Sequence, residues 1–218
     1  MLSHVPLFAQ LPGDALEQLS TRLRRKRYGR GQPVFHQGDP GASLCVVAEG
    51  HIKLGVTSPE GREIIIDLLG PGDVFGELAL LDGDPRSADA VATEPSELLH
   101  LEREEFTRFL LQRPSLALEL LSILSRRIRR DTQLIQDATF LDVPARLART
   151  ILRLAKTPSG TGPPITPRLN QTDLAGLSGT TRETLNKWLG QLQDDGLIRL
   201  DRGRITVLDM ERLRQRVV

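Results

Sequence analysis

The sequence predicts an α+β protein in which a strand-rich N-terminal half, one long helix and a small helical C-terminal domain follow one another. Three observations support this class: frequent turn signals between residues 33 and 101, an unbroken helical pattern after Pro114, and two short helix patterns joined at Gly179. With 218 residues, the chain is long enough for one large domain or two modest ones.

The N-terminal half contains one short helix and a series of strands. Residues 11–29 predict a short amphipathic helix, whose basic tail, Arg24 to Arg27, we interpret as a solvent-exposed helix end. From Pro33 to about Leu101, glycine-rich turns such as QGDPG and GPGD separate short β-favouring runs. These runs are LCVVA, HIKLGV, REIIIDLL, AVAT and ELLHLE. Closely spaced short strands of this kind predict an antiparallel sandwich or barrel.

Residues 115–141 predict a long helix, because they contain neither glycine nor proline and their apolar residues recur at steps of three and four. These residues are Ala117, Leu121, Leu124, Ile128, Ile135 and Ala138. Such a narrow stripe is typical of a helix that packs along a partner helix, so it predicts a dimer interface. Asp131, followed by Thr132, interrupts the stripe. A polar residue there indicates a buried partner or a bound ligand, or else an interface that opens at this point.

A domain boundary is expected near residues 141–144, where Asp142 before Val143–Pro144 resembles a helix N-cap. That helix should run to about Lys156 and stop at the PSGTGPP loop. Residues 1–143 carry 16 Lys and Arg against 21 Asp and Glu, whereas residues 144–218 carry 13 against 7. The net charges of −5 and +6 indicate two domains with different partners, and the basic one is a candidate for nucleic acid.

The basic domain contains a helix-turn-helix pattern. NQTDLAGL predicts a first helix capped by Asn170 or Thr172, SGT predicts a turn at Gly179, and a second helix should run from the N-cap Thr181 to Gly196. The following LIRLDRGRITVLD predicts a β-hairpin, the wing of a winged helix.

The second helix of this pattern presents a polar face. Arg182, Glu183 and Asn186 or Lys187 should share the exposed side opposite Leu185. Arg and Lys suit the guanine O6 and N7 acceptors, and Glu suits the cytosine amino group. An ordinary solvated face is the alternative, but the turn, the wing and the basic charge together favour DNA.

Both halves of the chain resemble the cyclic-AMP receptor protein family, the CRP/FNR superfamily of bacterial transcription regulators. The resemblance is carried by GELAL…PRSA (76–88), RRIRRDTQLIQDATFLDVPARLA (126–148) and TTRETLNKWL (180–189). It implies a jelly-roll-like antiparallel β-roll that binds a cyclic nucleotide at residues 1–113. A dimerisation helix at 114–141 and a winged helix-turn-helix DNA-binding domain at 142–218 would follow.

The resemblance also implies a binding site for cyclic AMP, which would act as an allosteric effector and not as a catalytic cofactor. Gly76, Glu77 and Leu78 would surround the ribose and phosphate, with Glu77 accepting a hydrogen bond from the ribose 2′-hydroxyl. Arg86 would pair with the cyclic phosphate and Ser87 would donate to it, which agrees with the donors that a buried phosphate needs. An internal Glu77–Arg86 salt bridge that closes the turn is a compatible alternative.

The base would meet Asp131 and Thr132. Members that respond to cyclic AMP carry two adjacent hydroxyl residues there; Thr132 fits this pattern, and Asp131 departs from it. Two Asp131 carboxylates near a dimer axis would need neutralisation, for which Arg127 and Arg130 are candidates. DNA binding without cyclic AMP, or with another effector, is therefore the alternative function.

For DNA, the resemblance assigns base contacts to Arg182, Glu183 and Lys187, and phosphate contacts to Asn170, Gln171 and Thr181. A homodimer would place two recognition helices about one DNA turn (~34 Å) apart and would read a palindrome with TGTGA-like half-sites. RNA polymerase is the further partner that the family implies.

Other function classes lack their motifs. The histidines His4, His36, His51 and His100 are scattered, and no phosphate-binding G-x-x-x-x-G-K or G-x-S-x-G motif is present, so we expect neither an enzyme nor a metal site. The single Cys45 excludes an internal disulfide and an iron–sulfur sensor. No apolar run reaches the ~18–20 residues of a membrane span and no export signal is evident, so we expect a cytoplasmic protein.

Overall fold

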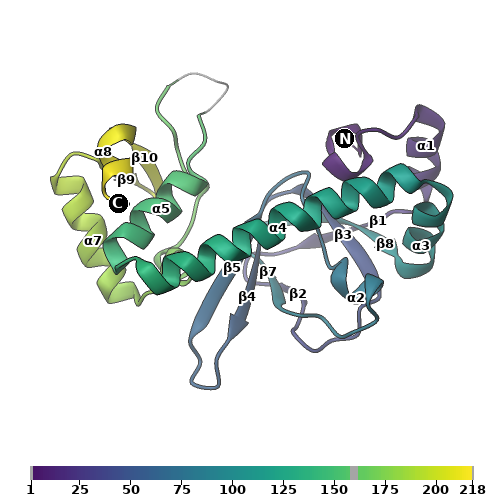
Figure 1. The fold of residues 1–218 in the computed structure, drawn as a ribbon, viewed down its shortest axis with the longest axis horizontal. Coiled ribbons are helices and arrows are strands. Elements are labelled where there is room, and N and C mark those ends of the chain that lie inside the picture. Colours follow the sequence, from purple (N-terminus) through teal and green to yellow (C-terminus); the bar gives the residue numbers. More distant parts are fainter. Residues whose placement is uncertain (1, 158–161, 218) are drawn as a thin grey trace. The chain divides into compact units, whose positions relative to one another are not determined.

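The computed structural model describes residues 2–157 and 162–217. The chain divides into two compact units, one formed by residues 1–61 and 66–131, the other by residues 62–65 and 132–218. Helix α4, Pro114–Phe140, is continuous across the division, as predicted (Figure 1). No helix within the described residues is both long and apolar enough to cross a membrane.

The first unit is built on two four-stranded sheets (Figure 1). One sheet has the order β1-β8-β3-β6, with bounds Arg24–Tyr28, Ser96–Glu102, Ser43–Glu49 and Val74–Phe75. The other has the order β2-β7-β4-β5, with bounds Pro33–Phe35, Asp89–Ala92, Ile52–Thr57 and Glu63–Leu69. The pairs β1–β8, β3–β8, β3–β6, β2–β7 and β4–β7 are antiparallel, which confirms the predicted roll.

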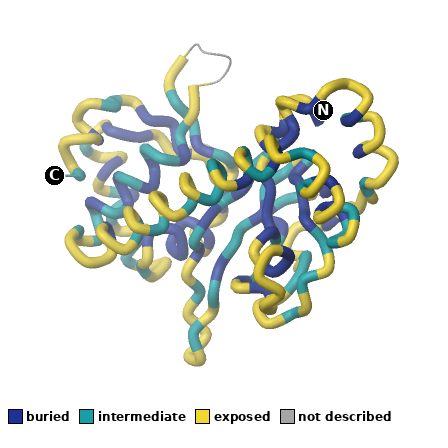
Figure 2. The backbone as a smooth tube through the Cα atoms, turned by 45° about the vertical axis from the view of Figure 1, so that its right-hand side comes forward, coloured by how far each residue is buried: buried dark blue, intermediate teal, exposed yellow. Residues whose placement is uncertain are grey.

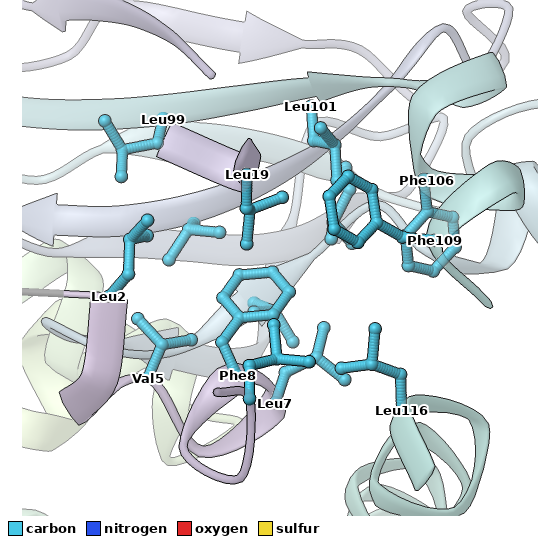
Figure 3. Close-up of a cluster of buried hydrophobic side chains, with 14 of the residues drawn as sticks. Leu2, Val5, Leu7, Phe8, Leu19, Leu99, Leu101, Phe106, Phe109 and Leu116 are labelled. Atoms are coloured by element: carbon cyan, nitrogen blue, oxygen red, sulfur yellow. The ribbon is translucent and has the colours of Figure 1, made fainter. Parts of the chain in front are cut away.

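Alternating residues of β3 and β8 contribute side chains to two different hydrophobic cores, because successive side chains of a strand point to opposite faces. Leu44 and Val46 face a core that also receives the N-terminal segment, whereas Cys45 and Val47 face the core between the sheets. Figure 3 shows the first core, where Phe106 and Phe109 lie side by side and Phe8 lies among leucines from several elements. Figure 2 shows buried strand centres and exposed turns, including the one between β4 and β5.

Helices cover the first core. They are α1, Gly13–Arg22, α3, Arg103–Gln112, and the start of α4. Leu116 and Leu120 of α4 are buried there, and Leu124 is partly buried against it. The residues of the predicted stripe on α4 therefore do not all face the same way, because Leu124 packs against the core of its own chain. The other large stripe residues, Leu121, Ile128 and Ile135, are 58–68% exposed.

The interpretation of Arg24 to Arg27 as a helix end was wrong. Helix α1 ends at Arg22 and these residues form strand β1. Pairing with β8 outweighs the low strand propensity of basic residues, because strand preference depends strongly on context. Arg25 and Arg27 also reach Glu97, at 2.5 and 3.1 Å, so one carboxylate partly offsets this run of cations.

The second unit contains the predicted winged helix-turn-helix. Helix α5, Val143–Leu154, begins at Asp142, whose side chain accepts a hydrogen bond from the Ala145 N–H at 3.0 Å. Helices α6, Gln171–Leu177, and α7, Arg182–Asp194, follow, then the hairpin of β9, Ile198–Asp201, and β10, Arg204–Val207, and finally α8, Met210–Gln215. Part of the predicted PSGTGPP loop lies outside the described residues.

Leucines form the packing between α6 and α7. Five of them are buried. They are Leu174, Leu177, Leu185, Leu189 and Leu192. Gly179, at the turn between the helices, has a φ of +59°, a conformation that residues with a side chain rarely adopt.

Candidate functional site

The segment from Gly76 to Ser87 connects β6 to β7 through the short helix α2, Leu78–Leu81. Gly76 has a φ of +80°, and a Cβ atom there would lie 2.4 Å from Nη1 of Arg86. Glycine is therefore required at position 76 for two reasons. It can adopt the positive φ, and it leaves the space that the Arg86 guanidinium occupies. The structure thus brings Gly76 and Arg86 into direct contact.

Arg86 is only 5% exposed and its guanidinium is held by the backbone. Nη1 donates to the Gly76 carbonyl at 2.6 Å, Nη2 donates to the Ser43 carbonyl at 2.8 Å, and the group lies 4.2 Å from the centre of the Phe35 ring. Nε is buried without a hydrogen-bond partner, and Arg86 forms no ion pair in the described part of the chain. Burial lowers the pKa of Arg86, and Cys45 and Glu77 oppose that shift. A buried cation without a counter-ion favours an anionic ligand.

Glu77 is fully buried, and its two carboxylate oxygens have different surroundings. Oε1 accepts a hydrogen bond from Nη1 of Arg127 on α4, whose Nη2 donates to the Val74 carbonyl at 3.0 Å. Oε2 is buried and has no hydrogen-bond partner. Glu77 therefore pairs with Arg127 and not with Arg86, so the alternative of an internal Glu77–Arg86 salt bridge was wrong.

Leu78 and Ser87 lie at the two ends of the same loop and are both exposed. Backbone hydrogen bonds fix the second end, because the Arg86 N–H donates to the Asp39 carbonyl at 2.8 Å and the Gly38 N–H donates to the Arg86 carbonyl at 2.9 Å. The five predicted phosphate and ribose residues thus belong to one loop with a buried acid and a buried base.

Further along α4, Arg130 forms an ion pair with Asp67 of β5. Asp131 is half-buried, and burial raises the pKa of its carboxyl group, while Arg127 opposes the shift. Thr132 is exposed. The two arginines expected to neutralise Asp131 thus have other ion-pair partners, Glu77 and Asp67. Arg127 also contributes to this site, and its role could not be predicted from the sequence because its partner lies 50 positions away.

The predicted DNA-contact residues lie on the exposed surface of the helix-turn-helix. Arg182, Glu183 and Lys187 are exposed on α7, opposite the buried Leu185. Gln171 of α6 joins this surface, because its Oε1 accepts hydrogen bonds from Arg182 Nε at 3.1 Å and from Asn186 Nδ2 at 3.2 Å.

Asn170 and Thr181 serve as the helix N-caps of α6 and α7. The Asn170 side chain accepts from the Asp173 N–H at 2.7 Å, and Thr181 accepts from the Thr184 N–H at 3.3 Å. The wing adds three exposed cations that were not among the predicted contacts. They are Arg199, Arg202 and Arg204. The DRGR turn in the sequence was a signal that could have identified two of them.

The described residues contain no group of three or more His, Cys, Asp or Glu side chains that could hold a metal ion. Cys45 is buried between the sheets, where burial raises the pKa of its thiol to about 12. The thiol is consequently protonated at neutral pH and inert.

Comparison with known proteins identifies both halves of the chain. Residues 25–113 match the cyclic nucleotide-binding domain family, and residues 145–216 match the Crp-like helix-turn-helix domain family. The chain is 34% identical over 219 residues to the CRP-like cAMP-activated global transcriptional regulator of Mycobacterium tuberculosis, covering 99% of this chain and 98% of that protein. It is 37% identical to the cyclic AMP receptor protein of Thermus thermophilus, covering 93% and 92%.

Solved structures agree with this assignment. The catabolite activator protein of Thermus thermophilus is 36% identical, with a TM-score of 0.56 and coverage of 97% of this chain and 98% of that one. The c-di-GMP responsive global regulator CLP of Xanthomonas campestris is 26% identical, with a TM-score of 0.77 and coverage of 91% and 100%. The chain therefore belongs to the CRP/FNR family of DNA-binding transcription regulators, the class that its sequence motifs predict, and not to a family of enzymes.

Proposed function

We propose that the chain is a homodimeric transcription regulator whose affinity for DNA is controlled by cyclic AMP bound at the Gly76–Ser87 loop. One observation carries the ligand part of this proposal. Nε of Arg86 and Oε2 of Glu77 are both buried without a hydrogen-bond partner. Buried polar atoms are nearly always paired, so these two atoms favour a ligand that donates to Oε2 of Glu77 and accepts from Nε of Arg86.

Cyclic AMP has the groups that these two residues need. Its phosphate is an anion for the Arg86 guanidinium, with a charge-assisted hydrogen bond to Nε. Its ribose 2′-hydroxyl is a donor for Oε2 of Glu77, while Gly76 and Leu78 line the sugar and Ser87 adds a hydroxyl for the phosphate. Thr132 would approach the base from the long helix. Two relatives also favour cyclic AMP as the ligand: the cAMP-activated regulator of Mycobacterium tuberculosis and the cyclic AMP receptor protein of Thermus thermophilus.

The homodimer is supported by the surface of α4. Leu121, Ile128 and Ile135 recur every seven residues, and each is more than half exposed in the single chain. A heptad repeat of apolar residues is buried when a second copy of the helix packs against it. We accordingly place the dimer interface within residues 114–141, between a ligand-binding domain at 1–113 and a DNA-binding domain at 142–218.

In the dimer, two copies of α7 would enter successive major grooves about one DNA turn apart (~34 Å) and read a palindrome with TGTGA-like half-sites. Arg182, Glu183 and Lys187 would contact base edges, while Asn170, Gln171 and Thr181 would position the backbone. Lys187 offers a point charge without the bidentate fork of arginine, so base discrimination at its position should be weaker. RNA polymerase would then be recruited by the DNA-bound dimer.

Ligand and DNA binding would be linked. If cyclic AMP shifts the dimer toward the DNA-binding conformation, it raises DNA affinity, and DNA raises cyclic AMP affinity by the same factor. A family member that binds DNA without cyclic AMP is the second candidate function, and the unusual Asp131 is the observation that favours it.

Calorimetric titration with cyclic AMP, combined with gel-shift measurements on a palindromic site at fixed salt, tests the proposal. Arg86→Leu should weaken nucleotide binding roughly 100-fold, because a hydrogen-bonded charge is lost. Arg108→Leu removes an exposed arginine from α3 and serves as the control, which should bind normally. DNA binding that is equally strong with and without cyclic AMP would favour the second candidate. Normal nucleotide binding by Arg86→Leu would contradict the assignment of the loop.

A further inference from the structure

Asp131 lies one helical turn beyond Arg127 on α4, and this spacing places it on the side of the helix that faces the Gly76–Ser87 loop. Residues four apart in a helix lie on one face, about 6 Å apart along the axis. Arg127 reaches Glu77 and the Val74 carbonyl from this face. A purine attached to a ribose at Glu77 would extend from this contact, and Asp131 is the acidic residue one turn from Arg127 on the same helix.

The Asp131 carboxylate is surrounded by charges but has no direct polar contact with the described residues. Within this part of the chain it accepts no hydrogen bond and forms no ion pair, although the charges of Arg127 and Arg130 on the same helix act on it. Those arginines are held by Glu77 and Asp67 and are therefore engaged elsewhere. The side chain is half-buried, and burial raises the pKa of the carboxyl group. A ligand that supplies N–H donors would stabilise its charged form.

The two purines differ at the edge that a carboxylate would meet. An ionised carboxylate is acceptor-only, with two oxygens. Guanine presents two adjacent donors, N1–H and the N2 amino group, and can give both oxygens a charge-assisted hydrogen bond. Adenine presents one donor, the N6 amino group, beside the N1 lone pair, which would face the second oxygen of Asp131 without a proton between them.

From these observations we propose that Asp131 is a specificity-determining residue that makes the base subsite accept guanine, so that the chain binds cyclic GMP at least as tightly as cyclic AMP. The inference rests on the proposed nucleotide site and concerns only its choice of base. The phosphate and ribose contacts of Arg86 and Glu77 are common to both nucleotides, so discrimination between them falls to the base contact.

Replacement of Asp131 by asparagine tests this assignment with little change in shape. An amide offers one acceptor and one donor, which matches the N6 and N1 positions of adenine and mismatches the two adjacent donors of guanine, N1–H and the N2 amino group. A matched bidentate contact discriminates bases by about tenfold or more. We therefore expect Asp131→Asn to shift the ratio of the cyclic GMP and cyclic AMP dissociation constants by at least about tenfold in favour of cyclic AMP.

The experiment is calorimetric titration of the full-length wild type, Asp131→Asn and Asp14→Asn with each nucleotide. Asp14 is an exposed residue of α1, so its replacement controls for the loss of one negative charge. A strong wild-type preference for cyclic AMP, or an unchanged ratio in Asp131→Asn, would overturn the inference and leave the nucleotide site standing. Absence of binding by either nucleotide to the wild type would instead contradict the proposed function and the inference with it.

Discussion

The buried pair of Glu77 and Arg127 leads to a quantitative prediction. Glu77 has no exposed surface, and the Arg127 side chain retains 18% of its own. Arg127→Met would keep most of the side-chain volume and remove the guanidinium. Oε1 of Glu77 would then lose its donor, and Oε2 has none to begin with. The variant would therefore carry a buried carboxylate without any hydrogen bond.

The expected loss follows from that uncompensated charge. Removing one partner of a buried ion pair costs about 3–5 kcal/mol in the free energy of unfolding. The hydrogen bond from Arg127 to the Val74 carbonyl disappears as well, which places the expected loss toward the upper end. Adding Glu77→Gln to the variant removes the charge with almost no change in volume, so it should recover most of the loss.

Urea unfolding followed by circular dichroism at one fixed protein concentration measures these differences, since the stability of an oligomer depends on concentration. Arg126→Met is the matched control. Its guanidinium bonds Ser122 Oγ at 2.7 Å, its side chain is 56% exposed, and its loss should cost less than about 1 kcal/mol. A loss below about 1 kcal/mol in Arg127→Met, or no recovery with Glu77→Gln, would refute the reasoning.

Three further predictions concern DNA contact, assembly and pH. Arg182→Ala should cost about 1–3 kcal/mol of DNA affinity and relax the sequence preference at one position of each half-site; gel shifts on a set of single-base variants check both effects. Ile128→Asp should convert the proposed dimer to a monomer in analytical ultracentrifugation, because it places a charge in the middle of the apolar repeat; a dimer that persists in the variant would exclude this face as the interface. Burial lowers the pKa of His100 from 6.5 to about 4, so the unfolded chain binds a proton between these values and the folded chain does not. The neutral, buried His100 therefore contributes to stability above pH 6.5, and this contribution is lost as the pH falls toward 4. After allowance for solvent screening, the loss in the free energy of unfolding is about 1–2 kcal/mol. His100→Gln should flatten the measured curve of unfolding free energy against pH.

The helix-turn-helix was predictable almost to the residue because its signals are local. Asn170 and Thr181 cap their own helices, and Gly179 supplies the conformation that the turn requires. Such signals act within three or four positions of the chain, so they can be read from the sequence without knowledge of distant contacts.

The roll was predictable as a class but not in every strand. The longer apolar runs became strands β3, β4, β5, β7 and β8. Strands β1, β2 and β6 were missed because they are charged or very short and are defined by the strands beside them. In such segments neighbouring backbone outweighs the preference of the residues themselves.

The Gly76–Ser87 loop shows the same limit at the level of side chains. The roles proposed for Glu77 and Arg86 toward ribose and phosphate come from the motif, but the groups that hold these two side chains could not be predicted from it. Arg86 is held by two carbonyls, 10 and 43 positions away, and Glu77 by an arginine 50 positions away. These pairings depend on how the chain folds back on itself and leave no local pattern.

The two oxygens of the Glu77 carboxylate have different surroundings, and this difference affects how a ligand would act. One oxygen is committed to Arg127 and the other is free to accept from a ligand. A hydroxyl that donates to Oε2 consequently need not break the hydrogen bond between Glu77 and Arg127 of α4. It would add a second hydrogen bond to a carboxylate that Arg127 already holds. Hydrogen bonds that share one charged group in a buried site polarise one another, so the ligand and Arg127 affect each other's energies through Glu77. Because Arg127 belongs to the same helix as the exposed repeat of Leu121, Ile128 and Ile135, a ribose bound at Glu77 would be linked to the proposed dimer interface through the Arg127 side chain.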